Sequence, residues 1–129
     1  MKTSCAKRIL VVDDEEVVRS LCSRVLTPAG YAVETAADGR EALDRFEQEP
    51  FDLVLTDQCM PGDLDGLKLG QLIKQRYPQT QIILMTAFPA VDSAVEMLRI
   101  GASDYLIKPF GPSELLGRLR SCLSRSSGH

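Results

Sequence analysis

Short, continuous apolar runs separated by helical patterns constrain the fold of this chain most strongly. Continuous hydrophobicity, as opposed to strict alternation, is typical of strands that are covered on both faces, as in a parallel sheet. The four runs are residues 9–12, 53–55, 82–85 and 105–107. We therefore expect four buried parallel strands.

A further strand is expected at an edge of that sheet. Residues 31–38 alternate between two faces, and the more apolar face carries Tyr31, Val33, Thr35 and Ala37. The other face is more polar, which is typical of a strand that is only half covered. The sheet would then have five strands.

The segments between these strands carry apolar residues at helical spacing. Each stripe predicts one amphipathic helix packed on the sheet. The stripes are Val17, Val18, Leu21, Cys22, Val25 and Leu26; Ala42, Leu43 and Phe46; Leu69, Leu72, Ile73 and Tyr77; Ala94, Val95 and Leu98; and Leu115, Leu116, Leu119, Cys122 and Leu123. Gly30 and Gly101 follow such stripes where C-terminal caps belong, and Pro112 suits a first helical turn. Asp65 is expected to cap a helix N-terminus.

Five strand-helix units in a chain of 129 residues predict an α/β fold of three layers. In this architecture a doubly wound, five-stranded parallel sheet has helices on both faces. No linker, repeat or low-complexity tract interrupts the pattern before the last residues. Residues 1–129 are therefore interpreted as a single domain with its core at about 7–123 and a tail at 124–129.

Charge and cysteine content argue against several classes of protein. The net charge is −3 and the charges are interspersed, so we expect neither direct nucleic-acid binding nor a polybasic membrane patch. No apolar run in the sequence approaches the roughly 20 residues of a membrane span, and no signal peptide is recognised. Cys5, Cys22, Cys59 and Cys122 form no C-x-x-C pair, and three of the four lie in apolar patterns. Reduced core thiols and a cytoplasmic location are the expectation.

Polar residues gather at the carboxyl ends of the predicted strands, where doubly wound sheets carry their chemistry. Three crowded carboxylates repel one another, and a hard divalent cation such as Mg²⁺ would offset more of that charge than one ammonium group. Acids before a helix can also simply favour its N-terminus, but Asp57 and Lys108 at neighbouring strand ends favour a cation site. The residues at these ends are Asp13, Asp14, Asp57, Thr86, Ala87 and Lys108.

Four motifs together resemble a known family. They are ILVVDDE at 9–15, LVLTDQCMPG at 53–62, ILMTA at 83–87 and DYLIKPF at 104–110. In this order and at these spacings they resemble the receiver domain of two-component response regulators, in the CheY-like superfamily. The resemblance covers about residues 7–123 and implies a flavodoxin-like fold with strand order 2-1-3-4-5.

The resemblance implies a role for each acidic position. Asp57 matches the phosphoacceptor, whose carboxylate takes a phosphoryl group from the phosphohistidine of a sensor histidine kinase or a phosphotransfer protein. Asp14, Asp57 and the backbone carbonyl of Cys59 match direct ligands of Mg²⁺, with Mn²⁺ as a substitute. Asp13 would act mainly through water. The metal would neutralise charge on the phosphoryl group during transfer.

The other matched positions would handle the phosphoryl oxygens and the output. Lys108 would bind Asp57 at rest and a phosphoryl oxygen afterwards, and by resemblance the bond from Lys108 to Pro109 is cis. Thr86 would supply its hydroxyl and Ala87 its backbone N–H. Tyr105 matches the aromatic switch that turns inward when Thr86 moves. The switching surface would be the fourth helix, the fifth strand and the fifth helix, which could also mediate dimerisation.

One departure leaves a question open. Residues 60–66, MPGDLDG, carry one residue more than the usual family spacing between Met-Pro and Asp-Gly. The path of this loop past the metal is therefore not predicted. Cys59 precedes the insertion and should be affected least.

The sequence favours phosphorylation-dependent signalling over the alternatives. We expect no enzyme activity beyond the domain's own phosphoryl transfer and slow autodephosphorylation. A receiver-like interaction module that is not regulated by phosphorylation remains the alternative, although such modules usually lose an acid, the Thr or the Lys. A dinucleotide-binding enzyme would need a glycine-rich turn where this chain has DDEE at 13–16. An aspartyl phosphatase would need a second Asp where Cys59 stands.

Overall fold

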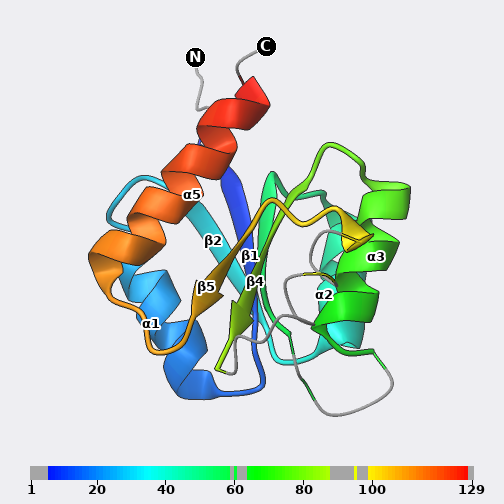
Figure 1. Cartoon of the computed structure of the whole chain (residues 1–129), viewed down its shortest axis with the longest axis horizontal. Coiled ribbons are helices and arrows are strands. Elements are labelled where there is room, and N and C mark those ends of the chain that lie inside the picture. The colour runs from blue at the N-terminus through cyan, green and yellow to red at the C-terminus, as the bar shows by residue number, and fades with distance from the viewer. Residues whose placement is uncertain (1–5, 59, 61–63, 88–94, 96–98, 128–129) are drawn as a thin grey trace.

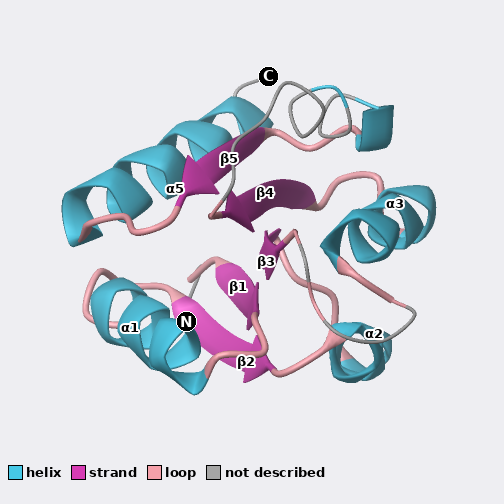
Figure 2. Ribbon diagram, turned by 60° about the horizontal axis from the view of Figure 1, so that its bottom comes forward, coloured by secondary structure: helices cyan, strands magenta, loops and turns pink. Residues whose placement is uncertain are grey.

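A five-stranded parallel sheet forms the centre of the structure (Figure 2). The computed structural model describes residues 6–58, 60, 64–87, 95 and 99–127. The strand order is β2-β1-β3-β4-β5 and every neighbouring pair is parallel, which confirms the flavodoxin-like order. The strands are β1 Arg8–Val12, β2 Ala32–Ala36, β3 Leu53–Asp57, β4 Gln81–Thr86 and β5 Asp104–Ile107.

Helices cover both faces of this sheet, as predicted. Helices α1 and α5 lie on one face, and α2 and α3 lie on the other (Figure 1). Their bounds are α1 Glu16–Leu26, α2 Gly39–Gln48, α3 Gly66–Arg76 and α5 Pro112–Ser127. Of the predicted fourth stripe, Val95 is helical, whereas Ala94 and Leu98 lie outside the described residues.

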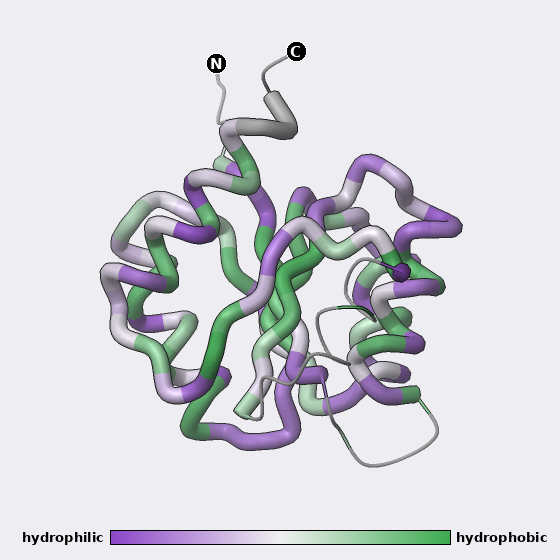
Figure 3. The backbone as a smooth tube through the Cα atoms, viewed as in Figure 1, coloured by the Kyte–Doolittle hydropathy of each residue, from purple (hydrophilic) through white to green (hydrophobic). Residues whose placement is uncertain are grey.

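Alternation within each strand explains the continuous apolar runs. Ile9 and Val11 pack with α1 and α5, whereas Leu10 and Val12 pack with α2 and α3. All four side chains are 0% exposed. Successive strand residues point to opposite faces, so in a strand with a core on each side both sets of positions favour apolar residues. Apolar segments accordingly fill the middle of the molecule in Figure 3.

The apolar stripe predicted for α1 was too wide. Cys22 and Leu26 are buried, but Val17 is 79% exposed and Leu21 is 40% exposed. A helix that lies flat on a sheet buries a stripe of limited width, and each residue advances by about 100° around the axis. Val17 and Leu21, four residues apart, lie together at the margin of that stripe, so the prediction that they join the core was wrong.

The prediction for the edge strand was also partly wrong. Strand β2 lies at an edge, but Ala36 is only 1% exposed and packs into the core between the sheet and α2. Tyr31 and Val33 pack only partly buried against the opposite core. Ala36, on the face predicted to be more polar, is therefore the most buried residue of β2. The reason is that α2 follows β2 directly and covers its end.

The residues predicted to begin and end helices are confirmed in those positions. Gly30 and Gly101 have φ values of 104° and 79°, the left-handed region that favours glycine at helix ends. The Asp65 side chain caps α3 by accepting from the Lys68 backbone N–H at 3.0 Å. Pro112 opens α5, and the Lys108-Pro109 peptide bond is cis.

The described cysteines fit the prediction of reduced core thiols. Cys22 and Cys122 are both buried thiols that form no disulfide bond, while Cys5 and Cys59 lie outside the described residues. Burial, together with the charge of Asp13, raises the pKa of the Cys22 thiol to about 12. This thiol is therefore protonated at neutral pH. Among the described helices, none combines the length and the hydrophobicity needed to cross a membrane.

Candidate functional site

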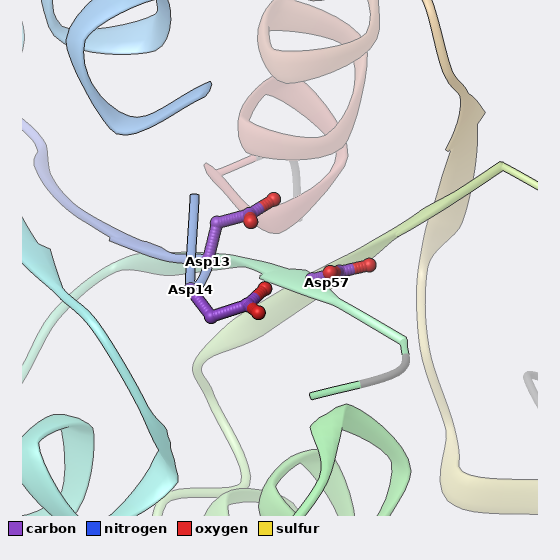
Figure 4. Close-up of side chains that lie close together, drawn as sticks. All are labelled: Asp13, Asp14 and Asp57. Carbon is purple, nitrogen blue, oxygen red and sulfur yellow. The ribbon is translucent and has the colours of Figure 1, made fainter. Parts of the chain in front are cut away.

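Three carboxylates meet at the carboxyl ends of β1 and β3 (Figure 4). Asp13, Asp14 and Asp57 each offer an oxygen atom, and these atoms lie within 4.8 Å of one another. Asp13 is 0% and Asp57 is 9% exposed, whereas Asp14 is exposed to solvent. The cluster therefore has a buried wall and an open side.

Strand register brings these acids together although they are far apart in the sequence. Val12 of β1 pairs with Thr56 of β3, so Asp13 and Asp57 follow at the same level. The Asp13 backbone N–H extends the ladder by donating to the Ala36 carbonyl at 3.1 Å. Both acids are thus held by backbone pairing of central strands.

Lys108 places an ammonium group among these carboxylates. Its Nζ lies 2.8 Å from Asp13 Oδ2, 3.5 Å from Asp57 Oδ2 and 3.6 Å from Glu15 Oε1. Burial lowers the pKa of Lys108, but its hydrogen bond to Asp13 and the charges of Asp57 and Asp13 outweigh this effect, so the pKa is raised. Lys108 is therefore a fixed cation at neutral pH.

The end of β4 forms the next part of the site. Asp57 pairs with Met85, so Thr86 lies one residue beyond the level of Asp57. Thr86 is 5% exposed, and its carbonyl accepts from the Lys108 backbone N–H at 2.7 Å. Ala87 follows and is exposed. Cys59 lies outside the described residues.

Tyr105 shares a sheet face with Thr86. The register pairs Leu84 with Tyr105 and Thr86 with Ile107. Because alternate residues point to one face, Thr86 and Tyr105 lie on the same side of neighbouring strands. Tyr105 is partly buried there against the core that α2 and α3 cover.

Gly66 lets α3 begin against the backbone of Asp57. A Cβ atom at this position would lie 1.8 Å from the Asp57 carbonyl oxygen, and the Gly66 N–H donates to the Gln58 carbonyl at 3.1 Å. Only glycine permits so close an approach. The loop with the extra residue thus ends where Gly66 packs against the backbone of Asp57, the phosphoacceptor candidate.

Comparison with known proteins decides the family. The model of the response regulator receiver domain matches residues 9–120. The chain belongs to this family. Its four motifs and its acidic cluster all lie within the matched segment.

Curated relatives of this receiver domain are longer proteins. The chain is 44% identical over 93% of its length to the response regulator MprA of Mycolicibacterium vanbaalenii, and it covers 52% of that protein. It is 41% identical over 93% of its length to the alkaline phosphatase synthesis transcriptional regulatory protein PhoP of Bacillus subtilis, covering 50% of it. The chain therefore spans about half the length of these relatives.

Solved structures include receivers of similar size. The chemotaxis protein CheY4 of Vibrio cholerae matches with a TM-score of 0.87 and 35% identity, covering 92% of this chain and 99% of that one. A CheY-like receiver from Methanospirillum hungatei matches with a TM-score of 0.89 and 33% identity, covering 94% and 96%. These likenesses confirm the predicted fold.

The acidic cluster of this receiver fits a metal ion. Carboxylate oxygens are hard ligands, and Mg²⁺ is typically held by one or two carboxylates together with water and phosphate oxygens. Asp13, Asp14 and Asp57 provide such oxygens on one open-sided site. Lys108 carries one positive charge against the three negative charges of Asp13, Asp14 and Asp57, so a divalent ion would neutralise the charge that remains.

Sequence reasoning missed two contacts of this receiver site. Arg19 Nη1 donates to the Asp13 carbonyl at 2.6 Å, and the Glu15 backbone N–H donates to Asp13 Oδ1 at 2.9 Å. Both come from the loop and the first turn that follow β1. An arginine one turn into a helix is common on protein surfaces, so its spacing alone gave no signal.

Proposed function

We propose that this receiver domain takes a phosphoryl group onto Asp57 and changes one of its surfaces in response. The observation that carries the proposal is the position of Asp57 at a central strand end, beside two further carboxylates and Lys108. The donor would be the phosphohistidine of a sensor histidine kinase or phosphotransfer protein. Family membership supports this choice.

The transfer is a nucleophilic substitution at phosphorus. A carboxylate oxygen of Asp57 attacks the phosphorus, the bond to the imidazole nitrogen breaks, and its electron pair returns to that nitrogen. Lys108 Nζ lies 3.5 Å from Asp57 Oδ2 and would bind a phosphoryl oxygen after transfer. Thr86 and the Ala87 backbone N–H would serve the remaining oxygens.

Asp14, Asp57 and the Cys59 carbonyl would hold Mg²⁺, or Mn²⁺ in its place, and Asp13 would act mainly through water. When bound, the ion supplies charge neutralisation for the phosphoryl oxygens. The protein's own contribution is positioning, which is most of what it can offer to phosphoryl transfer. Asp57 suits that task because β3 lies between β1 and β4 and all five of its residues are buried.

The output would arise on the surface formed by β5, α5 and the predicted fourth helix, of which Val95 is described and helical. Thr86 and Tyr105 share a sheet face. A movement of the Thr86 hydroxyl toward a phosphoryl oxygen would therefore free space for Tyr105. Val95 and Ile107 are 44% and 43% exposed, which leaves apolar area for a partner or a second copy of the domain. The response would be a shift between two existing packings.

We place this domain, residues 1–129, in the cytoplasm as a switch that is neither an enzyme for other substrates nor a nucleic-acid binder. Two relatives are transcriptional regulators by name, PhoP of Bacillus subtilis and the probable regulator ycf27 of Guillardia theta. Because the chain spans about half of such proteins, control of an attached effector is the output that we favour.

Acetyl phosphate provides the direct test. Wild type, Asp57→Asn and the exposed control Asp44→Asn are incubated with acetyl phosphate, with Mg²⁺ and with EDTA, and intact mass is measured. We expect a phosphoryl adduct on wild type and Asp44→Asn that needs Mg²⁺, and none on Asp57→Asn. An equal adduct on Asp57→Asn would refute the site. No adduct on any protein, including after incubation with histidine kinases, would favour the unphosphorylated interaction module.

A further inference from the structure

Arg19 reaches back from the first turn of α1 to the backbone at the end of β1. Its Nη1 donates a hydrogen bond of 2.6 Å to the carbonyl oxygen of Asp13. That carbonyl belongs to the peptide group that joins Asp13 to Asp14. We propose that Arg19 is a positioning residue for the metal site: it fixes this peptide, and thereby directs the Asp14 carboxylate toward Asp57. The inference rests on the proposed function.

The surroundings of Asp13 show why its carbonyl matters. Its backbone N–H is bound to the Ala36 carbonyl at 3.1 Å, and its side-chain oxygens accept from the Glu15 N–H at 2.9 Å and from Lys108 Nζ at 2.8 Å. With the Arg19 contact added, every polar group of Asp13 has a partner. Asp13 is therefore held in one position, and the chain continues from it to Asp14.

The orientation of the Asp14 side chain depends on the fixed backbone of Asp13. Its carboxylate is exposed, yet one of its oxygens lies within 4.8 Å of oxygens of both Asp13 and Asp57. An exposed side chain gains little orientation from packing, so the backbone geometry before it decides where it points. Groups that orient a metal ligand are worth about 10-fold to 100-fold in affinity.

The start of α1 gives an independent reason for the contact. The N-cap residue Glu15 makes no capping hydrogen bond through its side chain. The turn between β1 and α1 is instead closed by Asp13, which accepts from the Glu15 N–H and from Arg19. Arg19 thus ties α1 to the strand end on which the acids stand.

Charge and positioning predict opposite effects when Arg19 is removed. Arg19 is a cation beside an acidic cluster, so by charge alone its loss would strengthen binding of a divalent cation. If Arg19 positions Asp14, its loss weakens that binding instead. The direction of the change therefore separates the two explanations.

The test is a calorimetric Mg²⁺ titration of wild type, Arg19→Met, Arg19→Lys and Arg24→Met. Arg24 is an exposed cation in the last turn of the same helix and serves as the matched charge control. We expect the Kd for Mg²⁺ to rise about tenfold in Arg19→Met. Arg19→Lys should recover part of the loss, and Arg24→Met should match wild type. Thermal unfolding in EDTA reports whether each variant is folded.

A second measurement distinguishes positioning from general damage. The rate of Asp57 phosphorylation by acetyl phosphate is followed in Arg19→Met at rising Mg²⁺. We expect saturating Mg²⁺ to restore the wild-type rate, because only the affinity for the metal is changed.

Equal or tighter Mg²⁺ binding by Arg19→Met would overturn the role of Arg19, while Mg²⁺ binding by wild type and its loss in Asp14→Asn would leave the proposed function standing. If wild type bound no Mg²⁺, both would fail.

Discussion

Lys108 lies closer to Asp13 than to Asp57. Its Nζ is 2.8 Å from Asp13 Oδ2 and 3.5 Å from Asp57 Oδ2. The resemblance predicted Asp57 as the resting partner, and the structure adds a shorter bond to the fully buried Asp13. The ammonium group thus lies between the two buried acids and offsets the charge of both.

Replacing Lys108 with Met should destabilise the metal-free domain. Removing one partner of a buried ion pair leaves a buried charge uncompensated and costs about 3 to 5 kcal/mol. Because Lys108 is 15% exposed, we expect a smaller loss of about 2 kcal/mol. Urea unfolding in EDTA measures it, with the exposed Lys68→Met as the control. Unchanged stability in Lys108→Met would show that solvent already screens the charges of Asp13 and Asp57.

The same residue should give a stability difference that depends on pH. The pKa of Lys108 is raised above its ordinary value of 10.5, so its contribution is complete below the unfolded-state pKa and is lost as pH rises through the folded-state pKa. The difference between wild type and Lys108→Met should therefore stay constant from about pH 7 to 9 and shrink above about 10.5. A difference that shrinks below pH 9 would contradict the raised pKa.

Asp14→Asn should stabilise the domain without metal and abolish its response to metal. The exposed Asp14 adds a third negative charge to the cluster, whose oxygens lie within 4.8 Å of one another. Like charges at such a distance repel by about 1 kcal/mol even in water. We expect a melting temperature a few degrees above wild type in EDTA, and no further rise when Mg²⁺ is added. Wild type should rise with Mg²⁺. A variant that still responded to Mg²⁺ as wild type does would remove Asp14 from the metal site.

Local pattern was enough to predict most of the fold. The runs at 9–12 and 53–55 marked central strands because only strands with a core on both sides are apolar at every position. The site residues followed from the rule that parallel strands end at one edge, which brought Asp13, Asp57 and Lys108 together. Strand order and individual roles came from the family resemblance.

What the sequence did not predict depends on how the elements pack and on which rotamers the side chains adopt. The exposure of Val17 is set by how α1 is rotated on the sheet, and periodicity constrains that rotation only loosely. The contact of Gly66 with the Asp57 backbone needs the position of α3 relative to β3. The bond from Arg19 to Asp13 depends on side-chain rotamers, about which residue spacing says nothing.

Gly66→Ala should damage the site through the backbone of Asp57. The added methyl group would lie 1.8 Å from the Asp57 carbonyl oxygen, so α3 or β3 must shift. Overpacking of this kind costs about 1 to 3 kcal/mol, and we expect the upper end because both partners are backbone. The free energy of unfolding measured in urea and the rate of phosphorylation by acetyl phosphate should both fall.

The matched control for Gly66→Ala is Gly117→Ala in α5, where nothing lies within 4 Å of the added atom. It should gain up to about 1 kcal/mol from helix propensity and keep the phosphorylation rate. Equal effects of the two substitutions would show that the close contact with Asp57 is not what matters.

Thr86→Val should separate phosphorylation from its output. Thr86 and Tyr105 lie on one face of neighbouring strands, so a displaced Thr86 side chain changes the space available to Tyr105. Valine keeps the shape and the strand preference of threonine but lacks the hydroxyl that would bind a phosphoryl oxygen. Asp57 should still accept a phosphoryl group in the variant, since its own position is unchanged. Amide NMR shifts with beryllofluoride and Mg²⁺ should then appear near Asp57 but be reduced at 104–107.

Thr80→Val is the control for loss of a buried threonine hydroxyl. The Thr80 hydroxyl donates to the Phe51 carbonyl at 2.8 Å, before the start of β4 and far from the acidic cluster. Its loss should cost about 1 to 3 kcal/mol by leaving that carbonyl without its partner, yet preserve the shifts at 104–107. If Thr86→Val kept the full response at 104–107, the hydroxyl would not be the link between Asp57 and Tyr105. The surface change would then have to travel through Lys108, whose backbone N–H is bonded to the Thr86 carbonyl in either variant.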